Sequence, residues 1–201
     1  MANKLTVGQQ KRVDAGQSAT NKSFKDVCKA CSEAADEHNC KVGTYQELKS
    51  GKKPNKKKCR KDGEAHHVIP DAVYRTYDRN DSSGLSSVNN ELQRMNGAPT
   101  MNDGIAICMS KKKHKKLHKR MNRRIKALGE DGVADLDEIK KICQEELANV
   151  KPPPPSQKCI ELANDGVERQ VRPNRKKKAR TNMTKVEIKK LKKNMKLKTT
   201  P

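Results

Sequence analysis

The strongest hydrophobic pattern in the chain is an apolar strand that runs directly into a long amphipathic helix. Residues 105–109 are apolar throughout, which predicts a buried strand. Ser110 then offers an N-cap, and residues 111–128 keep helical spacing until Gly129 ends the pattern. The positions that share the inner face of this predicted helix are His114, Leu117, His118, Met121, Ile125 and Leu128.

Two more helices are predicted from the same kind of spacing. Ser23 can cap the first, over residues 24–37, and Asp135 can cap the second, over residues 136–149. Both are short amphipathic segments of the length usual in small domains. The inward positions of the second helix are Leu136, Ile139, Ile142, Cys143 and Leu147.

The segments between these helices are short or irregular. Residues 68–69 (Val-Ile) predict a short strand that Pro70 stops, and residues 71–79 predict a helical turn. Residues 49–62 are a basic loop with glycine and proline as breakers. Residues 80–103 are rich in Asn, Ser, Gly and Pro, which predicts a long loop, and a loop of that length is usually either functional or disordered.

These patterns divide the chain into three parts. Residues 1–21 are polar without periodicity and predict a flexible leader, and residues 22–150 hold the predicted domain. Residues 151–201 predict a proline-rich spacer followed by a tail rich in Lys and Arg. That tail can serve as a DNA arm, as a localisation segment or as a solubilising extension.

Composition narrows the class of partner. The 201 residues carry 46 Lys and Arg against 24 Asp and Glu, a net charge of +22, which favours a polyanion such as nucleic acid. Only 32% of residues are hydrophobic, which supports a small core. No apolar run reaches the roughly 18 residues of a membrane helix, and no signal-peptide core is visible, so we expect no membrane span.

The seven cysteines allow three states. Cys28 and Cys31 have the spacing of half a zinc site, but they also follow the helical spacing of a core face. Structural zinc, disulfide bonding and free buried thiols therefore all stay possible, because spacing alone does not fix connectivity. Cys108, at the end of the predicted strand, is expected to be a free core thiol.

Four of the five histidines fall into two pairs, His66-His67 and His114-x-x-x-His118. The i, i+4 spacing of the second pair puts both imidazoles on one helix face. Imidazole binds transition metals and titrates near neutral pH, so the four together indicate metal-assisted chemistry. Adjacent strand residues point to opposite faces, so the first pair lines one site only if the strand ends or bulges there.

The order of these elements resembles the ββα-metal finger of the HNH nucleases. Residues 64–67 (Glu-Ala-His-His) are similar to the Glu-Leu-His-His segment of the colicin-type DNases, and residues 113–118 are similar to their Arg-His-x-x-Ile-His helix. Residues 65–70 with residues 103–108 resemble the AHH and GHH groups of HNH/endonuclease VII-superfamily toxins. The resemblance covers residues 59–128. It implies an α+β fold, a mainly helical small domain built around a ββα-metal finger. The Lys- and Arg-rich composition adds the prediction of a basic, partly disordered C-terminal tail.

The resemblance also implies a role for each residue that matches it. His67 would be the general base that takes a proton from water. Glu64 would orient an imidazole or a basic side chain, and Asn102 would fix the loop that holds the base, with Asp103 as the alternative. The metal ligands would be His66, His114 and His118.

The lysines at the start of the predicted long helix suggest how a phosphate docks. Cations in a first helical turn cost about 0.3–1 kcal/mol each, and a bound phosphate would offset that cost. Aromatic residues make up only 2% of the chain, which favours contact with a duplex backbone over stacking on single strands. The predicted nucleic-acid contacts are Lys111, Lys112, Lys113, Lys115, Lys116, Lys119 and Arg120.

Taken with the charge, the resemblance implies a metal-dependent DNA endonuclease that acts as a bacterial toxin or a type VI secretion effector. One divalent metal ion (Zn, Ni, Mg or Mn) would be its cofactor, and DNA and a cognate immunity protein would be the partners of a monomer. It would stay in the producer's cytoplasm until a non-classical route exports it into a target cell. Two alternatives stay open, a non-catalytic zinc-stabilised nucleic-acid-binding protein and an RNase on the same scaffold.

Overall fold

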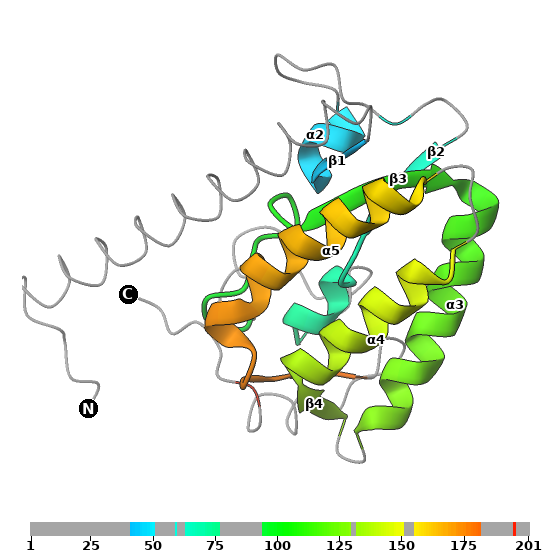
Figure 1. Ribbon diagram of the computed structural model, residues 1–201. Coiled ribbons are helices and arrows are strands. Elements are labelled where there is room, and N and C mark those ends of the chain that lie inside the picture. The colour runs from blue at the N-terminus through cyan, green and yellow to red at the C-terminus, as the bar shows by residue number, and fades with distance from the viewer. Residues whose placement is uncertain are drawn as a thin grey trace, which may run out of the picture.

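The computed structural model describes residues 41–50, 59, 63–76, 94–129, 132–150, 155–181 and 195 (Figure 1). Within these ranges the fold is α+β, as the sequence predicts, with two small antiparallel sheets and three long helices. The elements in chain order are β1 (Val42–Thr44), α2 (Tyr45–Ser50), β2 (Gly63–His67), η1 (Asp71–Tyr74), β3 (Ile105–Ser110), α3 (Lys111–Leu128), β4 (Val133–Asp135), α4 (Leu136–Ala148), α5 (Gln157–Val171), η2 (Arg172–Asn174) and β5 (Lys178–Arg180).

β3 is the central strand of the larger sheet and pairs antiparallel with β1 on one side and with β2 on the other. β2 ends at His67, so the prediction of a strand at residues 68–69 is wrong. Val68 and Ile69 are apolar because they enter the core, where they are 0% and 4% exposed. A two-residue apolar run does not distinguish strand pairing from simple burial.

α3 begins and ends where the hydrophobic spacing predicts. The Ser110 side chain accepts a hydrogen bond from the backbone N–H of Lys113 at 3.4 Å, which caps the helix. Gly129 ends it in an extended conformation, and a Cβ at that position would lie 2.5 Å from the carbonyl oxygen of Val133. The fully buried positions of the helix are Leu117, Met121 and Ile125.

α4 also follows its prediction, since all five of its expected inward residues are buried. Asp135 occupies the N-cap position, but its side chain makes no capping hydrogen bond. Its carboxylate lies 3.0 Å from the ammonium of Lys178 on β5 instead. The start of α4 is therefore tied to the smaller sheet, in which β4 pairs with β5.

The chain beyond residue 150 departs most from the prediction. A spacer and a tail were expected, but residues 155–181 belong to the folded domain, because α5 packs against α4 and β3 while β5 pairs with β4. Ser156 caps α5 by accepting a hydrogen bond from the backbone N–H of Cys159 at 3.3 Å. The prolines before α5 and the basic run after it obscure the row of apolar residues along this helix in the sequence. Its buried members include Cys159, Ile160, Ala163, Val167 and Val171.

α3, α4 and α5 lie side by side, and α5 crosses the larger sheet over β3 and β1 (Figure 1). α3 contacts both β2 and β3. This packing brings the histidines of α3 against the end of β2 and gathers one core between the helices and the sheet.

The expectation that Cys108 is a free core thiol is wrong, because Cys108 forms a disulfide bond with Cys59. Cys108 points to the opposite side of β3 from Ile107 and Met109, which fill the core, and so it can reach the segment after α2. Cys159 is also disulfide-bonded, whereas Cys143 is a buried free thiol.

Several predictions lie outside the described residues, namely the leader at 1–21, the helix at 24–37 and most of the basic loop at 49–62. The turn predicted at 71–79 is helical over η1, and Arg75 then forms an isolated bridge with Arg94. Every helix among the described residues is too short or too polar to cross a bilayer.

Candidate metal centre

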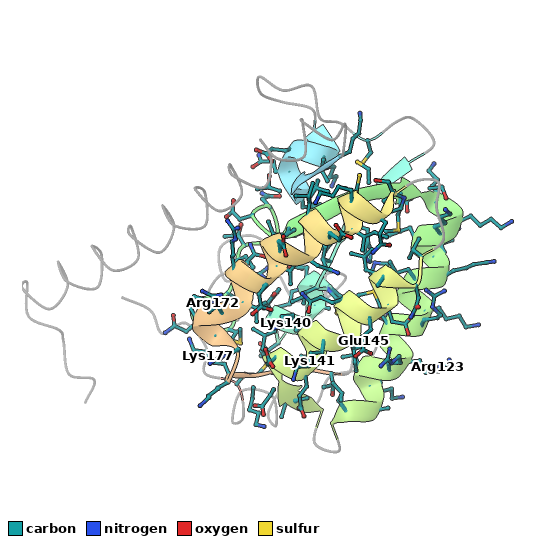
Figure 2. The ribbon with its side chains drawn as sticks, in the orientation of Figure 1. Arg123, Lys140, Lys141, Glu145, Arg172 and Lys177 are labelled. Carbon is teal, nitrogen blue, oxygen red and sulfur yellow. A yellow bond between two sulfur atoms is a disulfide. The ribbon has the colours of Figure 1, made fainter. Side chains whose placement is uncertain are left out.

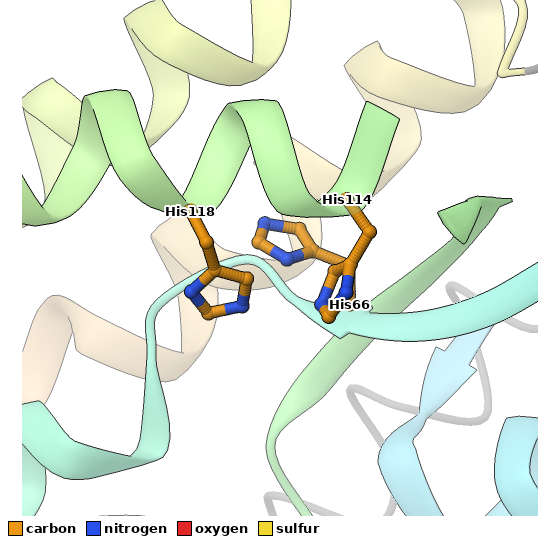
Figure 3. A group of neighbouring side chains, drawn as sticks. All are labelled: His66, His114 and His118. Atoms are coloured by element: carbon orange, nitrogen blue, oxygen red, sulfur yellow. The ribbon is translucent and has the colours of Figure 1, made fainter. Parts of the chain in front are cut away.

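Three histidines converge where β2 meets the first half of α3 (Figure 3). His66 comes from β2, while His114 and His118 lie one turn apart on one face of α3. One nitrogen from each ring can be chosen so that all three lie within 4.8 Å of one another. The ring centroids are 4.5 to 5.2 Å apart and the rings are steeply inclined to each other. Such a group can hold one ion through three imidazoles.

The surroundings of His66 are those expected of a metal ligand. Its side chain is fully buried, and neither ring nitrogen has a hydrogen-bond partner among the described residues. Leaving a buried polar group unpaired costs about 1–3 kcal/mol, and a bound cation would remove that cost at one of the two nitrogens. Burial lowers the pKa of His66 well below its usual value, and repulsion from His118, His114 and His67 lowers it further.

His118 is held neutral in a similar way. Burial, followed by repulsion from His114 and His67, lowers the pKa of His118 to about 4. A neutral imidazole has a free lone pair on one nitrogen, which is the form that binds metal. Near pH 7 both His66 and His118 are therefore in the form that can donate to a divalent ion.

Glu64 fixes the third imidazole. Its Oε2 atom lies 2.6 Å from Nδ1 of His114, so the carboxylate accepts the Nδ1–H hydrogen and leaves the Nε2 lone pair available. Both residues stand at the edge of the cluster, and Glu64 is two residues before His66 on β2. The structure thus places Glu64 in contact with an imidazole, the contact that the sequence resemblance implied.

His67 lies on the other face of β2 in different surroundings. Its ring stacks on Tyr45, with centroids 4.0 Å apart and planes inclined by 17°. Its Nε2 atom lies 2.8 Å from the carbonyl oxygen of Met101. Because a carbonyl only accepts, Nε2 carries the hydrogen in this contact and the lone pair is on Nδ1. His67 is thus oriented by protein groups and is separate from the three converging histidines.

The loop before β3 makes this contact through its backbone. We expected the Asn102 side chain to hold the loop, but that side chain is exposed, and the carbonyl of Asn102 accepts a hydrogen bond from the backbone N–H of Gln46 at 3.1 Å. Asp103 accepts the Thr100 hydroxyl at 2.6 Å. The carbonyl of Met101 therefore takes the position that the sequence reasoning gave to Asn102 or Asp103.

Most of the predicted nucleic-acid contacts lie on the outer side of α3. The exposed ones are Lys111, Lys112, Lys115, Lys116 and Lys119, and Lys113 is half-buried. Arg123 and Lys126 are also exposed and extend the same side of the helix, as Figure 2 shows for Arg123. Together these side chains form a basic face on α3.

Arg120 does not belong to that basic face. Its Nε atom donates to Oε2 of Glu146 on α4 at 2.6 Å, and Arg124 donates to the other oxygen of the same carboxylate at 3.1 Å. Arg120 is three residues after the buried Leu117, so it lies one turn along the side that meets α4. We therefore remove Arg120 from the set of predicted nucleic-acid contacts.

The sequence reasoning missed the groups that surround His67. Tyr45, whose ring stacks on His67, and Met101, whose carbonyl it contacts, are both far from it in sequence, and neither belongs to a motif with the histidines. Comparison with protein-family models, with curated proteins and with solved structures found no match.

Proposed function

We propose that this protein is a metal-dependent endonuclease that hydrolyses DNA phosphodiester bonds, with a ββα-metal centre of the HNH type formed by β2, β3 and α3. The observation that supports this best is that the four imidazoles near the end of β2 have two different kinds of surroundings. Three converge so that one ion could be held by all of them, and the fourth, His67, contacts a carbonyl and a stacked ring instead. Metal-assisted hydrolysis of a phosphodiester uses both an ion and a base that activates water.

The metal would be held by His66, His114 and His118, with Glu64 orienting His114. When bound, a divalent ion stabilises negative charge on the phosphoryl oxygens and on the leaving oxygen. Three imidazoles suit Zn or Ni by affinity, whereas Mg and Mn prefer oxygen ligands. Three protein ligands also leave a coordination position for substrate or water.

His67 would act as the general base through Nδ1. A water molecule gives a proton to Nδ1 while its oxygen forms a bond to phosphorus. The bond from phosphorus to one ester oxygen breaks, and that oxygen keeps the electron pair and takes a proton from solvent. The contact with Met101 supports this role, because it fixes the tautomer that leaves Nδ1 unprotonated.

DNA is the proposed substrate because of the basic face of α3. Its exposed cations form a run along one side of the helix that bears two of the three ligands. Backbone phosphates of a duplex are the contact that such a run fits, and binding of this kind weakens steeply with salt.

A bacterial toxin held by an immunity protein is the biological setting we propose. The Cys59–Cys108 disulfide supports export through an oxidising compartment, since disulfides form and persist mainly in such compartments. Export by a non-classical route and action as a monomer complete this proposal.

A non-catalytic zinc-stabilised nucleic-acid-binding protein is the second candidate. The complete burial of His66 favours it, because structural metal sites are closed to solvent. That candidate predicts DNA binding without cleavage and unfolding when the metal is removed.

Cleavage of supercoiled plasmid and of RNA by the full-length protein, with Mg, Mn, Ni or Zn added in turn, tests the proposal. We expect plasmid nicking with at least one of these metals, its loss with chelator, and its recovery when metal is restored. Cleavage that survives chelation would contradict the metal mechanism. RNA cleavage alone would move the activity to RNA, and no cleavage with any metal would favour the second candidate.

A further inference from the structure

The position of the His67 ring depends on the loop that precedes β3. Met101 accepts the Nε2–H of this ring at 2.8 Å. Gly104 lies so close to the ring that a Cβ at residue 104 would be 2.8 Å from Cδ2 of His67. Two backbone segments of one loop therefore touch the same imidazole, and any shift of the loop moves the ring or opens a gap beside it.

Gln170 on α5 holds this loop through both atoms of its amide. Its Nε2 atom donates to the carbonyl of Asp103 at 2.9 Å, and its Oε1 atom accepts from the backbone N–H of Ile105 at 3.2 Å. The two bonds bridge the backbone on either side of Gly104. Gln170 is 4% exposed, so water does not compete for them. The Gln side chain can make both bonds because its amide offers a donor and an acceptor in one planar group.

α2 holds the same loop from another element. The backbone N–H of Tyr45 donates to the carbonyl of Gly104 at 2.9 Å, while the ring of Tyr45 stacks on His67. The bonds from α2 to the loop are made by backbone N–H groups, so a change of side chain other than to proline leaves them in place. The bonds from Gln170 to the loop come from a side chain, so a substitution of Gln170 removes them and shows what they do to His67.

We propose that Gln170 is a positioning residue for His67. By fixing the backbone of residues 103–105, it sets where Met101 and Gly104 lie and so holds the imidazole with Nε2–H on the carbonyl, the tautomer in which the lone pair is on Nδ1. This inference rests on the proposed function for the use made of Nδ1, while the positioning itself is a property of the fold.

The expected effect is confined to one kinetic constant. Displacing a catalytic group by about 1 Å can cost about 100-fold in rate, so removal of the Gln170 bonds should lower kcat by about 10- to 100-fold. KM and metal affinity should change less than about twofold, because the polar contacts of Gln170 are with the loop and not with the three ligands or the basic face of α3.

The test compares Gln170→Met, which keeps the size and loses both bonds, with Gln170→Glu, which keeps only the acceptor. Gln144→Met is the matched control, because Gln144 Nε2 donates to the carbonyl of Asn164 at 3.3 Å and links α4 to α5 away from the loop. Each protein is measured for kcat and KM on plasmid, for Ni²⁺ affinity by calorimetry, and for the His67 tautomer by long-range ¹H–¹⁵N NMR.

We expect Gln170→Met to lose kcat and the single Nε2–H tautomer of His67, Gln170→Glu to lose less of both, and Gln144→Met to match the wild type. An unchanged tautomer with unchanged kcat in Gln170→Met would overturn the inference, as would a parallel fall in Ni²⁺ affinity. If Gln170→Met does not fold, the same two readouts in Gln170→Glu decide. If the wild type cleaves nothing, the proposed function fails, and the NMR result still decides whether Gln170 fixes His67.

Discussion

Two adjacent histidines with different surroundings are the main feature at the residue scale. Strand alternation sends His66 toward α3 and His67 toward Tyr45 and the loop before β3. His66 is buried without a hydrogen-bond partner among the described residues, whereas His67 has a carbonyl acceptor. A metal would bind one nitrogen of His66, whereas His67 is already held by Met101 and Tyr45, so one dipeptide can supply both a ligand and a base.

Glu64 carries the first prediction. Glu64→Ala should weaken Zn²⁺ or Ni²⁺ binding by about 10- to 100-fold, because groups that orient a metal-bound histidine typically contribute that much. Glu64→Gln should weaken it less, since the amide oxygen still accepts from Nδ1–H of His114. Calorimetric titration measures both, with Glu138→Ala on the exposed side of α4 as the control. Affinity within twofold of wild type in Glu64→Ala would show that His114 is oriented without this carboxylate.

At this scale the sequence identifies side chains but not backbone contacts. The four histidines could be found because histidine is rare in the chain and both pairs have informative spacing. The partner of His67 could not, because it is the carbonyl of Met101, which every residue type possesses. The same limit explains why Asn102 was the expected residue for that position and why its side chain lies at the surface.

At the scale of elements, ion pairs link neighbouring segments and shape the basic face. Arg120 and Arg124 both donate to Glu146, which joins α3 to α4. Asp71 in η1 receives Arg75 at 2.8 Å and Arg94 at 2.7 Å, and so ties η1 to the segment that leads into the loop before β3.

Asp71→Asn tests this second link. Removing one partner of a buried ion pair costs about 3–5 kcal/mol, so the free energy of unfolding should fall by about that amount at pH 7. Burial alone would raise the pKa of Asp71, but the pairs with Arg94 and Arg75 outweigh it and lower the pKa. The stabilisation is therefore present above the ordinary pKa of about 4 and is lost as the pH falls through the lowered value.

Urea unfolding at pH 7 and at pH 3 measures the effect. The difference between wild type and Asp71→Asn should shrink at the lower pH, and Asp165→Asn, an exposed change on α5, should have little effect at either. A difference that is small at pH 7, or that grows in acid, would contradict the assigned role of Asp71.

Elements were predictable where apolar periodicity was strong and uninterrupted. α3 and α4 follow their apolar rows closely, and Ser110 caps α3 as expected. α5 was missed because its row consists of small and scattered apolar residues between prolines and a basic run. The burial of α5 depends on packing against α4 and β3. Contacts with elements distant along the chain are not visible in the local sequence.

At the scale of the whole molecule, different parts of the chain position the histidines and carry the positive charge, which is +22 in total. The core formed by the sheet and three helices fixes the histidines, while the outer side of α3 presents cations beside them. The Cys59–Cys108 disulfide joins residues 49 apart, and closing a loop of this size stabilises the folded state by about 4 kcal/mol in the chain-entropy model.

The central claim is that three histidines hold a metal and His67 acts as the base beside them. Its most direct test measures metal stoichiometry and plasmid nicking together in His67→Ala and His118→Ala. His67→Ala should bind one metal ion as the wild type does and lose about 100-fold or more of its nicking rate, while His118→Ala should lose both. Nicking that persists in His67→Ala, or metal binding lost equally in both variants, would contradict the account.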